Sequence, residues 1–168
     1  MAEGAAWERL FPSLLDRLVD NEPDKRSEAR DFRSFSVTRL RESVLRDLNW
    51  LFNATQHEEE GLDRFPQVRQ SVINYGIPAL SGRPASSLNI QEVEQMLRRS
   101  IIAYEPRLLP DTVKVKAEAD EAGLARHNVI SFRIEAQMWA QPYPLDLLLR
   151  TEVDMENGAS KVVESGRG

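Results

Sequence analysis

The chain has 168 residues, 41% of them hydrophobic and 29% charged, which is the composition of one globular domain with a hydrophobic core. Its formal net charge of −5 provides no basic field, so neither nucleic acid nor anionic lipid is expected as a main ligand. The sequence contains no cysteine, which excludes disulfides, thiol catalysis and thiolate metal sites.

The N-terminal region, residues 1–35, is predicted to hold a short helix and a polar linker. Leucines at helical spacing predict an amphipathic helix within the segment from Pro12 to Asp20, with the proline near the first turn. Residues 21–34 are polar and include Pro23, which predicts a solvated linker. Such a linker would allow the helix to move as an arm instead of packing in the core.

Two longer helices are predicted by apolar residues that recur at three- and four-residue steps. The first runs from Val37 to Asn53, with Ser36 as its N-cap. The second follows Asn89, which has the spacing of a capping box with Glu92, and ends at Glu105 because a proline comes next. The segments 55–67 and 68–82 between them are predicted to be loops with one short helical turn.

Beyond Pro110 the apolar residues alternate with polar ones, which predicts strands within 112–119, 130–140 and 147–155. Asn157-Gly158 is a two-residue hairpin signal, and the residues KVVE that follow offer a short fourth strand. Strands this close in sequence should pair antiparallel. The predicted class is α+β, with N-terminal helices on one face of a C-terminal antiparallel sheet of three to four strands. We expect one domain over residues 36–164 and a disordered tail at 165–168.

No catalytic or cofactor-binding motif is found. Phosphate-binding loops and dinucleotide fingerprints are absent, and His57 and His127 are far apart and outside any H-E-x-x-H motif. We therefore expect no metal, no cofactor and no small-molecule ligand. No window approaches the ~20 apolar residues of a membrane helix, and charged residues interrupt the N-terminal segment where a signal peptide would be apolar. We expect a cytoplasmic protein that is not embedded in a membrane.

Paired carboxylates are what a glycoside hydrolase requires, so the acidic residues are the remaining catalytic candidates. The run 58–60 is interpreted as a solvated loop, and Glu135 lies on the wet face of a predicted strand. Glu105 stands in the apolar stretch IIAYEPRLLP, but Arg107 would hold it ionised, whereas a general acid must be protonated. We expect no enzyme, and a peptidoglycan-hydrolysing enzyme is the alternative.

Two aromatic features are open to a structural or a binding interpretation. Trp139 with Pro142, Tyr143 and Pro144 forms a cluster at a strand end, which we interpret as a bend that terminates pairing, with a contact surface as the alternative. Trp50 lies off the apolar stripe of the first long helix. We expect it to pack in the core, with a docking anchor as the alternative.

The triplet Glu105-Pro106-Arg107, at the end of a helix and before a sheet, stands among segments that together resemble one family. SVLRDLNWLFNAT and VINYGIPALSG precede it, and ISFRIEAQMWAQPYPLDLLLRTEVD follows. From about Pro12 to about Met155, the sequence is similar to the TssE subunits of bacterial type VI secretion baseplates. These are relatives of the gene-25-like baseplate wedge protein of contractile phage tails.

The resemblance implies a structural role. It implies contacts with other baseplate wedge subunits and with contractile sheath subunits, a sheath-like sheet where the first sheath ring docks, and a baseplate at the cytoplasmic face of the inner membrane. It associates Glu105, Pro106 and Arg107 with protein binding. A small regulatory adaptor on the same scaffold is a further alternative.

Two points stay open from the sequence. Arg107 can pair with a partner protein or internally with Glu105, and from the first reading we expect Arg107→Ala to leave the fold intact while weakening assembly. An extended arm of a sheath subunit can add to a free sheet edge, for which the strands near Lys114 and near Val153 are the candidates.

Overall fold

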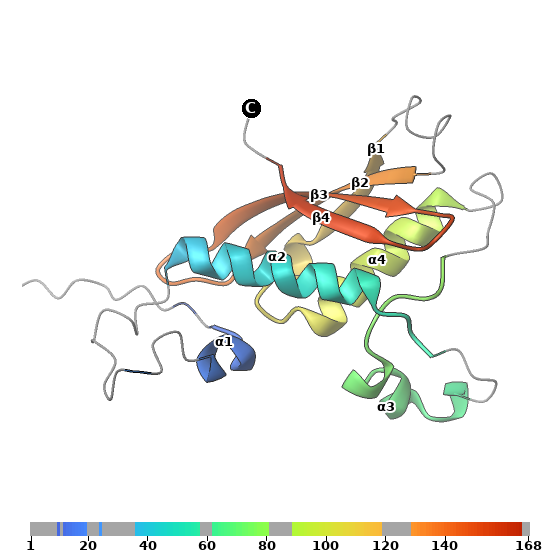
Figure 1. Cartoon of the computed structure of the whole chain (residues 1–168), viewed down its shortest axis with the longest axis horizontal. Coiled ribbons are helices and arrows are strands. Elements are labelled where there is room, and N and C mark those ends of the chain that lie inside the picture. Colours follow the sequence, from blue (N-terminus) through green and yellow to red (C-terminus); the bar gives the residue numbers. More distant parts are fainter. Residues whose placement is uncertain are drawn as a thin grey trace, which may run out of the picture.

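The computed structural model describes residues 10, 12–19, 24, 36–57, 62–80, 89–118 and 129–165. The helices are α1 (Leu14–Leu18), α2 (Val37–Asn53), α3 (Pro66–Arg69) and α4 (Ile90–Tyr104), and the strands are β1 (Lys114–Glu118), β2 (Val129–Met138), β3 (Leu145–Asp154) and β4 (Ser160–Glu164). Short 3-10 turns lie at Leu62–Arg64, Val72–Asn74 and Pro110–Thr112. Helices come first and strands afterwards, which confirms the predicted α+β class (Figure 1).

The strands form one antiparallel sheet in the order β1-β2-β3-β4, and the residues KVVE lie in its fourth strand. The two edges of this sheet are therefore β1 and β4. The prediction of an edge near Lys114 is confirmed. The prediction of an edge near Val153 is wrong, because Val153 lies in β3 and pairs with Ser160 of β4.

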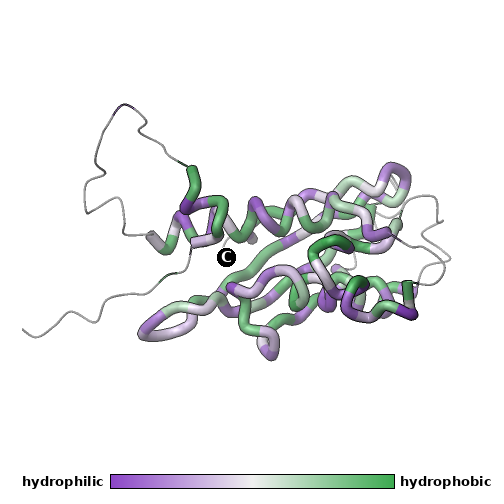
Figure 2. The backbone as a smooth tube through the Cα atoms, turned by 90° about the horizontal axis from the view of Figure 1, so that it is seen from below, coloured by the Kyte–Doolittle hydropathy of each residue, from purple (hydrophilic) through white to green (hydrophobic). Residues whose placement is uncertain are grey.

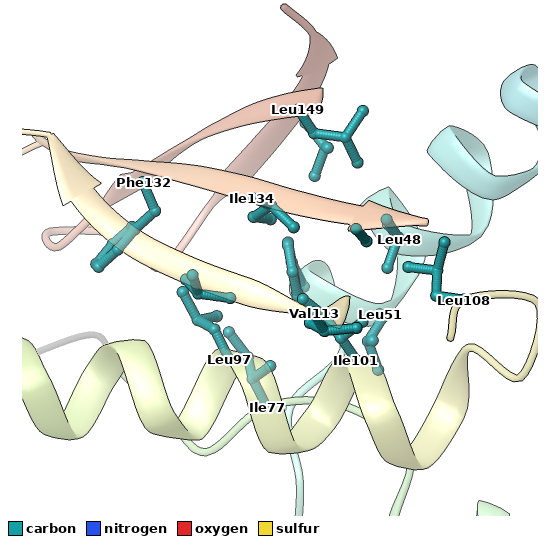
Figure 3. Packing of buried hydrophobic residues seen from close by; sticks show 14 of the residues in the cluster. Leu48, Leu51, Ile77, Leu97, Ile101, Leu108, Val113, Phe132, Ile134 and Leu149 are labelled. Atoms are coloured by element: carbon teal, nitrogen blue, oxygen red, sulfur yellow. The ribbon is translucent and has the colours of Figure 1, made fainter. Parts of the chain in front are cut away.

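The core lies between the sheet and the two long helices, which cover one of its faces (Figure 1). Leu97 and Ile101 point from α4 toward the strands in Figure 3 and are fully buried. The predicted core face of the strands is confirmed by the buried residues Ile130, Phe132, Ile134, Ala136 and Met138 of β2 and Leu147, Leu149, Thr151 and Val153 of β3. Ser131, which the alternation places on the wet face of β2, is buried as well. Polar and apolar residues also alternate along the helices (Figure 2), as expected for helices with one buried side.

The helix boundaries follow from local signals. Ser36 caps α2 by accepting a hydrogen bond from the backbone N–H of Arg39, as predicted. Asn89 caps α4 by accepting from the N–H of Gln91, but Glu92 accepts from the Asn89 side-chain amide and not from its backbone. The reciprocal capping box of the described chain is instead at α1, between Ser13 and Asp16.

The turn between β3 and β4 is wider than the two-residue hairpin predicted from Asn157-Gly158. The Asp154 carbonyl accepts from the N–H of Gly158 at 2.8 Å, and its carboxylate accepts from the N–H of Glu156 at 2.8 Å. These bonds close a four-residue loop, in which Gly158 takes the left-handed conformation with φ 76°.

Several expectations fall outside the described residues. They concern the acidic run 58–60, His127, the tail 166–168, and the linker 21–34 apart from residue 24. His57 is described and exposed, and its backbone N–H donates to Asn74. No helix in the described part of the chain is long and apolar enough to cross a membrane.

Candidate functional site

The triplet forms a fixed corner between α4 and the sheet. Glu105 is the C-cap of α4, and its N–H still donates to the Ile101 carbonyl at 2.8 Å. Beyond Pro106, the carbonyl of Arg107 accepts from the N–H of Trp139 at 2.7 Å. Two residues later, the N–H of Leu109 donates to the carbonyl of Gln137 in β2 at 2.8 Å. Both ends of the corner are therefore held by backbone hydrogen bonds.

Glu105 and Arg107 pair with each other. The Arg107 Nε donates to Oε1 of Glu105 at 2.7 Å, its Nη2 donates to Oε2, and its backbone N–H adds a bond of 3.1 Å to Oε1. The pair is sequestered, since 3% of the Glu105 side chain and 10% of the Arg107 side chain are exposed. Of the two readings left open by the sequence, the structure of this chain contains the internal pair.

Arg107 also reaches helix α2. Its Nη2 donates to Oδ2 of Asp47 at 2.6 Å, and its Nη1 donates to the hydroxyl of Ser43 at 2.9 Å. Burial disfavours the charged guanidinium, but the hydrogen bonds and charges of Glu105 and Asp47 outweigh this and raise the pKa of Arg107. One cation thus ties the corner to α2.

Sequence reasoning missed Ser43 and Asp47 as partners of the triplet. Their position in the sequence could have indicated this role, because they stand one turn apart beside the apolar stripe of α2 that contains Leu40, Val44 and Leu48. A polar residue at the border of a buried stripe needs a hydrogen-bond partner from another element.

Helix α1 docks on the same cluster through polar contacts. Asp16 accepts from Arg46 of α2 at 2.6 Å and lies 3.9 Å from Arg107. The guanidinium of Arg46 in turn stands over the ring of Trp50, 5.1 Å from its centroid. None of the α1 residues is buried. The expectation that Trp50 packs in the core is wrong, because the residue is 51% exposed.

An apolar groove of about 1000 Å³ opens beside this cluster. The rings of Tyr75 and Tyr104 meet edge to face in its wall, with centroids 5.2 Å apart. Trp50, Val72 and Trp139 also line it, together with the triplet. Trp139, interpreted from sequence as part of a bend, therefore belongs to the same surface as the triplet.

The docking of α1 should depend on pH through Asp16. Burial alone would raise the pKa of Asp16, but hydrogen bonds from Arg46 and Ser13 outweigh burial and hold this pKa below its ordinary value of 3.8. Because the pKa of Asp16 is lower in the docked state, its charge stabilises docking fully at any pH above the ordinary pKa of 3.8. This stabilisation is lost as the pH falls through the lower pKa of the docked state. We expect tryptophan emission to report the release of α1 from Arg46 and Trp50 in acid. Asp16→Asn should show the released signal already at neutral pH, and identical profiles for the two proteins would contradict the assignment.

The carboxylates are not arranged as a hydrolytic pair. Both carboxylate oxygens of Glu105 accept from Arg107, so neither is presented to a substrate. Glu135 is exposed and lies in β2 opposite Lys114, and no contact joins it to Glu105 among the described residues. Within the described ranges, no group of three histidine, aspartate or glutamate side chains could hold a metal ion.

Comparison with known proteins identifies the family. The model of the family described as baseplate wedge protein gp25 matches residues 38–143, a span that runs from α2 through α4 and the triplet to the β2–β3 connection. No curated protein matches the chain, and no solved structure does. Since the match covers more than half of the 168 residues, the chain belongs to the baseplate wedge protein gp25 family, a family of structural baseplate proteins that includes TssE.

Proposed function

We propose that this chain is a baseplate subunit of a type VI secretion machine, which binds other wedge subunits and initiates polymerisation of the contractile sheath at the cytoplasmic face of the inner membrane. Membership of the baseplate wedge family carries the proposal. In this role the protein works by presenting surfaces to neighbouring chains, and it has no catalytic step. The TssE-like segments named above support the assignment to a secretion machine.

The wedge contact is proposed at the triplet and the groove beside it. Glu105 and Arg107 are turned inward on each other, so their part is to hold the groove in shape, whereas Pro106 is exposed and free to touch a partner. Val72 is 81% exposed and Trp50 51% exposed at this surface. Large apolar and aromatic side chains of this kind are the anchors of protein interfaces.

The sheath contact is proposed at the β1 edge. In β1, the even-numbered residues pair with β2, so the backbone groups of Val115 and Ala117 face outward. Among the described residues, Glu94 accepts from the Ala117 N–H, and nothing bonds the outward groups of Val115. An extended arm of a sheath subunit can bind at Val115 and take the place of Glu94 at Ala117, as a fifth strand. This mode of binding needs only a short stretch of unpaired backbone and no reacting group.

A proline in the accepting edge tests the sheath contact. Ala117→Pro removes the outward N–H that donates to Glu94 in the unbound chain and that an added strand would have to bind. Ala117 is small and half-buried near the end of β1, so we expect sheath binding to be lost while wedge binding persists. Glu164→Pro, near the end of β4, is the matched control and should bind both. Pull-down of purified sheath and wedge subunits measures this. Normal sheath assembly with Ala117→Pro would overturn the strand contact, and peptidoglycan cleavage by the purified chain would overturn the non-enzymatic role.

A further inference from the structure

The β4 edge is occupied by two side-chain amides from helix α2. Asn49 donates to the Val162 carbonyl at 3.2 Å and accepts from the Val162 N–H at 2.9 Å. One turn later, Asn53 does the same for Ser160, at 2.8 and 3.0 Å. Each amide therefore satisfies both outward groups of one β4 residue, as the backbone of a neighbouring strand would.

At the β1 edge, helix α4 bonds only some of the outward backbone groups. Glu94 accepts from the N–H of Ala117 at 2.9 Å, and Arg98 donates to the carbonyl of Val113 at 2.9 Å. Among the described residues, nothing bonds the outward N–H and C=O of Val115, which lies between them. A cavity of about 370 Å³ between α4 and this edge leaves space for further chain.

The charged side chains that line this cavity favour an incoming strand of the opposite charge. Its lining contains four cationic side chains, Arg98, Lys114, Lys116 and Arg133, and two carboxylates, Glu94 and Glu135. The cavity is thus net positive in a chain whose total charge is −5. Lysines on an edge strand oppose pairing with the same edge of a second copy, because like charges would face each other. The same lysines are complementary to acidic side chains on a different strand.

We propose that the sheet is a one-sided acceptor. Asn49 and Asn53 block strand addition at Ser160 and Val162 of β4. A single extended segment of a partner, with acidic side chains at alternate positions, adds to β1 beside α4. The identification of the partner as a sheath subunit rests on the proposed function. The closing of β4 and the charge preference of β1 are independent of it. The two asparagines thereby determine which edge a baseplate subunit offers to its neighbour.

Removing the two amides tests the closing of β4. In Asn49→Ala/Asn53→Ala, alanine preserves the helix, but the outward groups of Ser160 and Val162 lose their partners. We expect amide hydrogen exchange at these two residues to accelerate about 10-fold or more, and the variant either to self-associate or to bind a second copy of the added strand.

The matched control is Thr38→Ala/Glu42→Ala, two exposed α2 residues at the same spacing. It should exchange like the wild type at β4 and keep the oligomeric state of the wild type. If Asn49→Ala/Asn53→Ala also showed wild-type exchange at Ser160 and Val162, the closing of β4 by these side chains would be overturned.

Two synthetic nine-residue peptides test the β1 edge, one alternating glutamate with valine and one alternating lysine with valine. We expect the acidic peptide to shift the Val115 amide resonance of the full chain and the basic one to leave it unchanged. Lys114→Glu/Lys116→Glu should weaken binding of the acidic peptide about 10-fold or more. Lys161→Glu, which changes the matched lysine of β4, should leave its binding unchanged.

Equal binding of both peptides, or a shift of the Val162 resonance in place of that of Val115, would overturn the one-sided acceptor. If the chain bound the acidic peptide at Val115 but did not bind purified sheath subunits, strand addition at β1 would be supported. The proposal that the partner is a sheath subunit would then be overturned.

Discussion

Replacing Arg107 with alanine is expected to lower the free energy of unfolding by about 3–5 kcal/mol. The change removes the cation that binds both carboxylate oxygens of Glu105, a side chain that is 3% exposed. Asp47 loses its 2.6 Å contact at the same time. A buried carboxylate left without its partner keeps the cost of desolvation and loses the attraction that offset it. This replaces the sequence-based expectation that Arg107→Ala leaves the fold intact.

Urea unfolding of three variants measures the effect and its cause. Arg46→Ala removes an arginine that is 32% exposed, so it should cost less than about 1 kcal/mol. The double change Glu105→Leu/Arg107→Met removes both charges and should recover most of the stability lost in Arg107→Ala. Wild-type stability of Arg107→Ala would show that the pair contributes nothing to the fold.

The same variants separate stability from binding. Because Glu105 and Arg107 face each other, their contribution to the wedge contact is to place Pro106 and the groove. We therefore expect wedge binding by folded Glu105→Leu/Arg107→Met to be closer to the wild type than binding by Arg107→Ala, measured where both are folded. A partner that contacts the guanidinium itself would bind neither.

The sequence predicts the elements well because their signals are local. The boundaries of α2 are those predicted, and α4 ends before Pro106 as expected, since capping residues, apolar steps and proline act within a few positions. The alternation along β2 and β3 likewise identified the buried faces. The turn after Asp154 differs because a carboxylate competes with the backbone for the turn, which the dipeptide Asn157-Gly158 does not reveal.

The contacts that define the site are not local. Arg107 reaches Ser43 and Asp47 across more than fifty residues, and Asn49 reaches Val162 across more than one hundred. In the sequence these α2 residues are simply polar residues beside an apolar stripe. Their partners depend on how α2 crosses the sheet, which no periodicity specifies. The free edge was undecided for the same reason, because it depends on whether the short β4 pairs with β3.

The second large effect is expected at Gly76, whose φ is 130°, a conformation that side chains disfavour. A Cβ there would lie 2.3 Å from the carbonyl oxygen of Ala54, well inside van der Waals contact. That same oxygen accepts from the N–H of Ile77 at 2.9 Å, and Gln56 donates back to the Ile77 carbonyl. The glycine therefore allows the segment after α2 and the segment before α4 to bond directly.

We expect Gly76→Ala to lower the free energy of unfolding by about 2–4 kcal/mol, through backbone strain and loss of this close approach. It should also weaken wedge binding, because the neighbouring Tyr75 would move from Tyr104 and lose the hydrogen bond from its hydroxyl to the Asp47 carbonyl. Gly158→Ala, in the turn after β3, is the control. It carries left-handed strain of about 1 kcal/mol but lies away from the groove, so binding should be unaffected. Equal losses of wedge binding in the two variants would mean that strain alone, and not the placement of Tyr75, governs this surface.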